Sequence, residues 1–150
     1  MTAPGATLRI PAWVKRLGEI PEQVTREAMA DARDFLRAEV RKNASKGGER
    51  GLRVRTGRLL KSIRTYLKVT DKGAELSLGM VFYGWVHNRG AVIVPKAAPR
   101  LHFFIPGVGW RTAMRVVLPA RPFASDALEA TERAFPRYLH AALERATRPA

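Results

Sequence analysis

The 150-residue chain has a hydrophobic fraction of 46%, which is enough to build the core of a single domain. It contains no cysteine, which excludes disulfides, cysteine zinc sites and thiol nucleophiles. Its 27 Lys and Arg residues against 13 Asp and Glu residues leave a formal net charge of +14. A charge of that sign favours an anionic partner, either nucleic-acid phosphate or an acidic protein surface.

The positive charge is concentrated in two stretches without acids, one between Glu49 and Asp71 and one between Glu75 and Asp126. Plain solubility explains such a charge as well as binding does. The N-terminus lacks the apolar stretch of a signal peptide, and the longest apolar run, residues 80–86, is far shorter than the roughly 20 residues that span a bilayer. We therefore expect a soluble protein, made in the cytoplasm, with no membrane partner.

The N-terminal part of the chain has a helical pattern. A short helical piece is predicted around residues 13–17, and a longer amphipathic helix is predicted from near Pro21 to near Asn43. Proline is well tolerated at a first helical position, which places the start of that helix. The apolar residues at helical spacing are Val24, Ala28, Ala32, Phe35 and Leu36.

The next segments alternate between loop, helix and strand signals. Residues 45–55 have glycines among charged residues and no apolar periodicity, so we expect a mobile loop with nothing to pack against. Thr56 is predicted to cap a short helix over residues 58–63, its hydroxyl accepting a backbone amide of the first turn. Alternating apolar residues then predict an antiparallel hairpin over residues 66–80, with its turn at residues 71–73.

Residues 91–118 form a long β-rich insert. Strands are predicted over residues 92–94, 101–105 and 113–118, and the last two are predicted to pair as a second hairpin about a turn-rich segment at residues 106–112. The insert carries more apolar area than an exposed hairpin would leave in water. It therefore either returns to its own core or is covered by a partner, and we favour the partner.

The C-terminal part is helical again. Ser125 and Asp126 are predicted to open the final helix, and Pro136 must either kink it or begin a new segment. The order of elements contains no βαβ alternation, so the fold class is α+β. We expect one domain over residues 1–150, in which an antiparallel sheet carries the N-terminal and C-terminal helices on one face and the β-rich insert extends from it.

Few groups are available for catalysis. His87, His102 and His140 each lack a second histidine or carboxylate at metal-ligand spacing, so they are read as ordinary structural histidines. No serine, glycine-rich loop or carboxylate pair stands in a catalytic pattern. We predict no enzyme activity, no cofactor and no metal.

Three segments have unusual local chemistry. In residues 56–63, TGRLLKSI, Arg58 stands in the first turn of a helix, where the macrodipole disfavours a cation, so we expect an anionic partner for it. Residues 80–90, MVFYGWVHNRG, concentrate aromatic side chains and end at a glycine; such a cluster is usually core. In residues 119–123, PARPF, two prolines stiffen the chain around Arg121 just before the final helix.

Together and in this order, the three segments resemble the tail-completion or neck proteins of long-tailed bacteriophages, a family of virion morphogenesis proteins. In that family a TGRL-x-x-SI segment precedes the sheet, a tyrosine-rich segment ends in His-x-x-Gly or Glu-x-Gly-Thr, and a PARPF-type segment leads into a C-terminal helix. The resemblance covers roughly the middle half of the chain. These motifs do not separate tail completion from the tail-terminator role, and the insert over residues 91–118 is longer than in many relatives.

The resemblance implies a structural subunit that performs no reaction. Copies would join into a ring, expected to be hexameric, around the DNA channel at the head–tail junction of the virion. The implied partners are neighbouring neck and tail proteins and, without sequence specificity, the DNA in the channel. We expect Arg58 and Arg121 to act either between subunits or within their own subunit. The candidate interface residues are Arg58, Arg89, Val92, Ile93, Phe104, Trp110 and Arg121.

The alternative is a basic nucleic-acid-binding module or a small ribonuclease such as a toxin of the RelE type. Such a nuclease needs a cluster of Arg, Lys, His or Tyr beside the substrate phosphate, and the sequence alone assembles one only by free choice. A steep loss of nucleic-acid affinity with salt would support this alternative, because binding through phosphates releases counterions.

Overall fold

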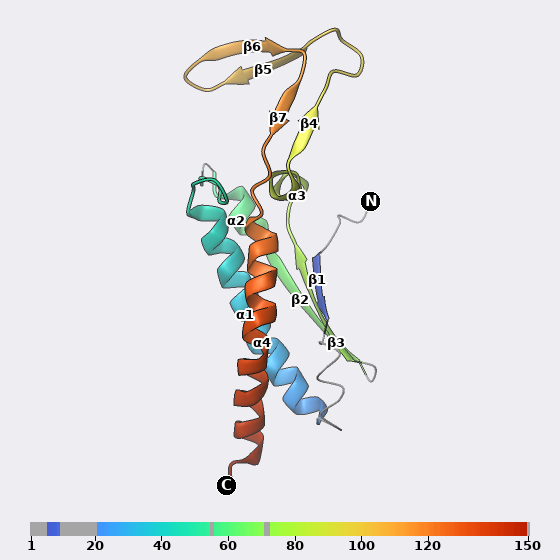
Figure 1. The fold of residues 1–150 in the computed structure, drawn as a ribbon, viewed down its shortest axis with the longest axis vertical. Helices are drawn as coiled ribbons and strands as arrows, with labels where there is room; N and C mark the ends of the chain where they lie inside the picture. Colours follow the sequence, from blue (N-terminus) through green and yellow to red (C-terminus); the bar gives the residue numbers. More distant parts are fainter. Residues whose placement is uncertain (1–5, 10–20, 55, 71–72, 150) are drawn as a thin grey trace.

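The computed structural model describes residues 6–9, 21–54, 56–70 and 73–149 (Figure 1). The chain mixes helices with small antiparallel sheets and is α+β, as the sequence predicts. The helical piece predicted around residues 13–17 lies outside the described residues. In chain order the elements are β1 (Ala6–Arg9), α1 (Glu22–Ser45), α2 (Arg58–Ser62), β2 (Arg64–Thr70), β3 (Gly73–Gly79), α3 (Phe82–Arg89), β4 (Ala91–Ile93), β5 (Leu101–Ile105), β6 (Gly109–Ala113), β7 (Val116–Leu118) and α4 (Phe123–Thr147).

The body of the molecule is a pair of long helices packed against a small sheet. Figure 1 shows α1 and α4 running side by side, with β1, β3 and β2 lying along one side of the pair. β3 is the central strand and pairs antiparallel with both β1 and β2. The sequence did not predict β1. Fully buried alanines on the two helices, such as Ala28 and Ala127, let neighbouring elements approach closely.

Local patterns predicted the body well. α1 begins directly after Pro21, whose carbonyl accepts the first helical N–H bond from Val24 at 3.0 Å. The predicted hairpin is formed by β2 and β3, and its apolar residues alternate into the core. Phe35, predicted in the buried stripe of α1, is half-buried and packs on Tyr138 with ring centroids 5.9 Å apart. Residues 71–72 of the turn lie outside the described part of the chain.

The start and the continuity of α4 differ from the prediction. The helix begins at Phe123 rather than at Ser125, because Phe123 is fully buried and anchors the first turn in the core. One helix also continues through Pro136, so of the two expected alternatives, a kink or a new segment, the new segment is excluded. Pro136 is exposed, and its neighbours Phe135 and Leu139 are buried in the common core, which holds both halves of the helix in place.

Residues 46–54 are anchored, and the expectation that they have nothing to pack against is wrong. Leu52 packs against the core, its N–H donates to Ala44 O at 3.2 Å, and its carbonyl accepts from Gly47 N at 2.9 Å. Gly51 is buried, and a Cβ there would lie 2.5 Å from the Gly47 carbonyl oxygen. Backbone this close to the end of α1 tolerates only glycine. The mobility of the loop in solution stays a prediction.

The cap of the short helix α2 lies one residue later than predicted. Gly57 is the N-cap residue, with φ of 71°, and no side chain caps it. Thr56 still contributes, because its hydroxyl accepts a bond from Arg58 N at 3.3 Å.

Residues 91–118, which we call the arm, form two short antiparallel ribbons at one end of the molecule (Figure 1). β4 pairs with β7, and β5 pairs with β6. The predicted pairing of residues 101–105 with 113–118 is therefore wrong, and the turn occupies only residues 106–108 of the predicted segment 106–112. The reason is a tighter turn: Val108 N donates to Ile105 O at 3.0 Å, and Gly109, with φ of 98°, already pairs with Ile105.

Candidate functional site

The two strands of the arm leave the body at one crowded point. Gly90 ends α3 with φ of 76° and ψ of 165°, a conformation that is essentially restricted to glycine. A Cβ at this position would lie 2.8 Å from Ala120 N and 2.9 Å from Leu118 O, both on the segment that returns from the arm, residues 118–121. The glycine that the sequence indicates as a stop therefore also brings the outgoing and returning chains together.

Two buried asparagines hold the start of α4 beneath the arm. Asn88 of α3 accepts bonds from Ala124 N at 2.9 Å and Ser125 N at 3.2 Å, and its amide donates to Ser125 Oγ at 2.9 Å. Asn43 of α1 donates to Phe123 O at 3.2 Å. The first turn of α4 has no side-chain cap of its own, so Asn88 takes that role from another element. Sequence reasoning missed both residues, because a cap is normally sought one to three residues upstream.

Arg121 is fixed within its own chain. Its Nη1 donates to Gly48 O and Gly51 O, each at 2.8 Å, and its backbone N–H donates to His87 O at 2.8 Å. The sequence predicts a fixed acceptor for this arginine, between subunits or within one, and these acceptors lie within one. Arg121 thereby links the segment that returns from the arm to the loop that follows α1.

The other candidate arginines differ. Arg58 is exposed, and the described residues provide no anionic partner for its guanidinium group, so within this part of the chain the arginine is solvated. Arg89 lies 5.9 Å from the centroid of the Trp85 ring, a cation–π distance. Trp85 is buried, whereas Phe82 and Tyr83 are exposed, so the core interpretation of this aromatic segment holds for Trp85 alone.

The arm presents its apolar side chains to solvent. Val92 is 60% exposed, Ile93 42%, Phe104 56% and Trp110 72%, so none of them returns to the core of this chain. Phe104 and Trp110 face each other across β5 and β6 with ring centroids 5.6 Å apart, in an edge-on arrangement. Further exposed apolar residues of the arm are Val94, Ile105, Val108, Met114 and Val117.

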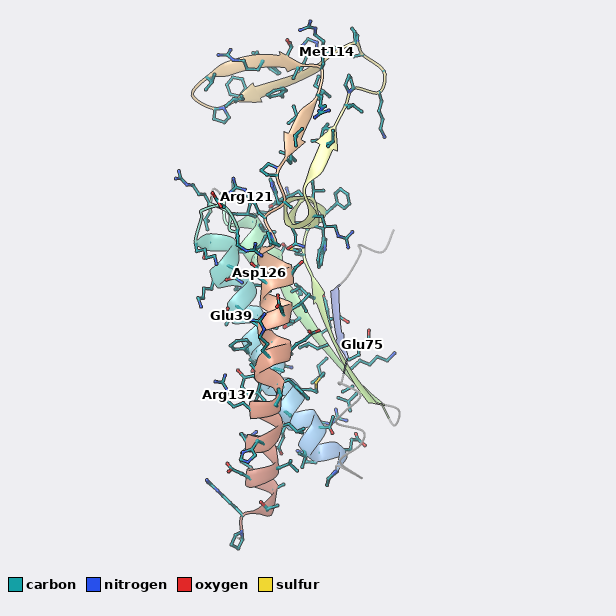
Figure 2. All side chains as sticks on the ribbon, viewed as in Figure 1. Glu39, Glu75, Met114, Arg121, Asp126 and Arg137 are labelled. Carbon is teal, nitrogen blue, oxygen red and sulfur yellow. The ribbon has the colours of Figure 1, made fainter. Side chains whose placement is uncertain are left out.

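The arm is also uniformly basic. It contains no Asp or Glu, and its charged residues are exposed. Figure 2 places Met114 at the far end of the arm, away from the acidic residues Glu39, Glu75 and Asp126 of the body. The charged side chains of the arm are Lys96, Arg100, Arg111 and Arg115.

A groove of about 810 Å³ lies at the base of the arm. We call it the basal groove; α2, α3, residues 48–54 and residues 118–121 line it, and the end of α1 contributes one residue. Its ionisable lining residues are Arg53, Tyr83, His87 and Arg121. Tyr83 and His87 stand four residues apart on α3 and so share a helix face, a spacing that was readable from the sequence. Arg53 and Arg121 come from distant segments, so the sequence did not indicate that they share the groove.

The histidines differ in their surroundings. Burial, and after it the charge of Arg121, lowers the pKa of His87 below its ordinary value, so its imidazole is neutral at pH 7. His140 lies 3.5 Å from Glu144 on the surface of α4, and His102 is exposed on the arm. Within the described ranges, no group of three or more His, Asp or Glu side chains is placed to hold a metal ion.

Comparisons with protein-family models, curated proteins and solved structures found no match. In the part of the chain that the structure describes, no helix combines the length and the apolar character needed to cross a membrane.

Proposed function

We propose that this chain is a structural subunit of the head–tail junction of a long-tailed bacteriophage, acting in tail completion or in a neck ring. The observation that carries the proposal is the arm. A soluble monomer rarely leaves a contiguous apolar surface uncovered, and here apolar side chains are exposed along both ribbons. Such a surface is typical of a subunit that a neighbour completes.

The construction of the arm supports the same conclusion. Isolated two-stranded ribbons are marginally stable in water, and each ribbon of the arm has free edges that a partner strand can extend. The base of the arm, by contrast, is fixed by Gly90, Asn88 and Arg121. A rigid base carrying a ribbon with uncovered apolar residues suits contact with a neighbouring subunit.

The proposal is tested by shortening the arm. A variant in which residues 93–116 are replaced by a short glycine linker retains the pairs Ala91↔Leu118 and Val92↔Val117 at the base. We expect it to fold, because the deleted segment contributes no residue to the core, and to form no rings. Light scattering after size exclusion and negative-stain microscopy measure ring formation, and circular dichroism checks the fold.

Point variants separate the apolar surface from the length of the arm. Phe104→Ser combined with Trp110→Ser should also abolish rings, whereas Phe82→Ser, which removes an aromatic residue that is 67% exposed on α3, should not. Rings that form normally without residues 93–116, or a wild-type chain that remains monomeric at high concentration with and without adjoining virion proteins, would contradict the proposal.

A second candidate is a basic nucleic-acid-binding module or a RelE-type ribonuclease. It is favoured by the exposed Trp110 among the cations of the arm and by the grouping of Arg53, Tyr83 and His87 in the basal groove. This candidate predicts a steep loss of nucleic-acid affinity with salt and RNA cleavage that His87→Ala abolishes. The structural proposal predicts that neither the parent chain nor the His87→Ala variant cleaves RNA.

A further inference from the structure

The basal groove has the size of a binding site, and most of its lining takes no part in the contacts of Arg121 that fix the base of the arm. Its volume of about 810 Å³ falls within the range of roughly 300–1,000 Å³ that ligand sites occupy. The arm's exposed apolar residues, which carry the proposed ring contact, are not part of its lining. What the groove binds is therefore a separate question from how copies of the chain assemble.

Most of the groove is apolar and partly uncovered. Val54 is 50% exposed and Tyr83 39%, and the leucines around them are only half-buried. Covering such side chains removes apolar surface from water, which favours an occupant with a large apolar group. The apolar lining residues are Leu52, Val54, Leu59, Leu60, Leu118 and Pro119.

The charge of the groove is of one sign. Among the described residues, no Asp or Glu lines it, whereas Arg53 and Arg121 both do. Arg53 is exposed, and its guanidinium group has no partner among the described residues. Arg121 uses Nη1 for the two loop carbonyls, and its other guanidinium nitrogens have no partner in the described part of the chain. The occupant that complements this lining is an anion attached to an apolar group.

We infer that the basal groove binds a segment of a partner protein in which a large apolar side chain stands next to a carboxylate. The apolar side chain would cover Val54 and the leucines, and the carboxylate would accept hydrogen bonds from Arg53 and Arg121. This inference goes beyond the proposed ring and holds whether or not copies of the chain assemble.

A nucleic acid fits the groove less well than an acidic peptide does. A polynucleotide needs a row of cations along its backbone and flat surfaces on which bases stack. Among the described lining residues, Tyr83 is the single Phe, Tyr or Trp, and apolar side chains outnumber cations. The peptide uses both kinds of lining residue.

His87 supplies a readout of occupancy. It shares the groove with Tyr83 of its own helix, with Arg53 of the loop and with Arg121 of the segment that returns from the arm. Burial and Arg121 keep its pKa below the ordinary value. A carboxylate placed among these groups offsets the charge of Arg121 and favours the imidazolium, so the pKa of His87 should rise on binding.

The test uses the full chain and a fluorescein-labelled peptide of sequence Asp-Glu-Leu-Phe-Glu-Asp, followed by fluorescence anisotropy. We expect saturable binding that a peptide with Asn and Gln in place of Asp and Glu does not show. Arg53→Gln should weaken the affinity about tenfold, the loss expected when a charge-assisted hydrogen bond is removed. Val54→Asp places a negative charge in the groove, which repels the acidic peptide, and should weaken the affinity at least as much.

Arg111→Gln is the matched control, because it removes one exposed cation from the arm, outside the groove. This variant should leave the affinity for the peptide unchanged. In the parent chain, proton NMR titration should show that the pKa of His87 rises when the peptide is bound. The inference is overturned if the peptide does not bind, or if Arg111→Gln weakens binding as much as Arg53→Gln. It is also overturned if single-stranded DNA displaces the labelled peptide at a lower concentration than the unlabelled peptide does. Ring formation by the same variants is scored separately, so failure here is distinguishable from failure of the proposed function.

Discussion

Gly90 decides where the arm leaves the body, and a single methyl group tests this. Gly90→Ala forces a side chain into a conformation reserved for glycine and places a Cβ 2.8 Å from Ala120 N. Backbone strain and the steric clash together should lower the free energy of unfolding by about 4 kcal/mol. Chemical denaturation followed by circular dichroism measures the loss.

Gly107→Ala is the control for that experiment. Gly107 also has a positive φ, of 85°, but a Cβ there would have nothing within 4 Å. Its cost should not exceed about 1–2 kcal/mol, the strain of a left-handed conformation alone. Equal losses for Gly90→Ala and Gly107→Ala would show that the close contact of Gly90 with Leu118 and Ala120 adds nothing to the cost of the substitution.

At the scale of elements, α4 depends on α3 for its first turn. Asn88→Ala leaves Ala124 N and Ser125 N without their acceptor in a buried place, so we expect a loss of about 2–3 kcal/mol in the free energy of unfolding. Ser125→Ala removes only the partner of the Asn88 amide and should cost about 1 kcal/mol. Thermal and urea unfolding compare the two variants, and a milder effect of Asn88→Ala than of Ser125→Ala would refute this capping role.

The same helix start is joined to the loop by an ion pair that makes stability depend on pH. Arg50 donates to both carboxylate oxygens of Asp126, at 2.9 Å and 2.7 Å, and this contact lowers the pKa of Asp126. A carboxylate with a lowered pKa in the folded state stabilises the fold above its unfolded pKa of about 3.9. The contribution disappears as the pH falls through the still lower pKa of the folded state.

Asp126→Asn should therefore be less stable than the parent chain at neutral pH, and the difference should shrink below about pH 4. Urea unfolding at a series of pH values from 7 to about 2.5 measures this difference. Glu132→Gln, at an exposed position of α4 whose side chain has no partner in the described residues, is the control and should show no such trend. A difference for Asp126→Asn that is independent of pH would argue against the ion pair as its cause.

At the scale of the whole molecule, the described acidic residues are confined to the body and are absent from the arm at one end. Figure 1 shows the arm at one end and the C-terminus at the other. Among the described residues, every Asp and Glu lies on the body and none on the arm. In the proposed ring, the arm would contact a different surface of the neighbouring copy, and such head-to-tail contacts close into a ring when the rotation between copies is that of a closed symmetry.

The sequence by itself determined the features that depend on neighbours within a few residues. Apolar spacing of three and four residues predicted the buried stripe of α1, and alternation predicted the hairpin of β2 and β3. Gly90 was readable as a stop because glycine tolerates positive φ. The sequence also indicated that the arm carries more apolar area than an exposed hairpin would leave in water, but not which of its side chains are exposed.

Tertiary structure alone decided the features whose partners lie far apart in the chain. Asn88 binds the start of α4, Arg121 binds carbonyls 70 and 73 residues away, and Leu52 packs into the core; each contact depends on segments that meet only after folding. For the same reason the sequence missed the packing of the loop and the start of α4, whereas the partner of β5 was decided by a tight local turn. The basal groove is assembled in this way too, since Arg53, His87 and Arg121 share one lining only because Arg121 bonds to both α3 and the loop after the chain returns from the arm.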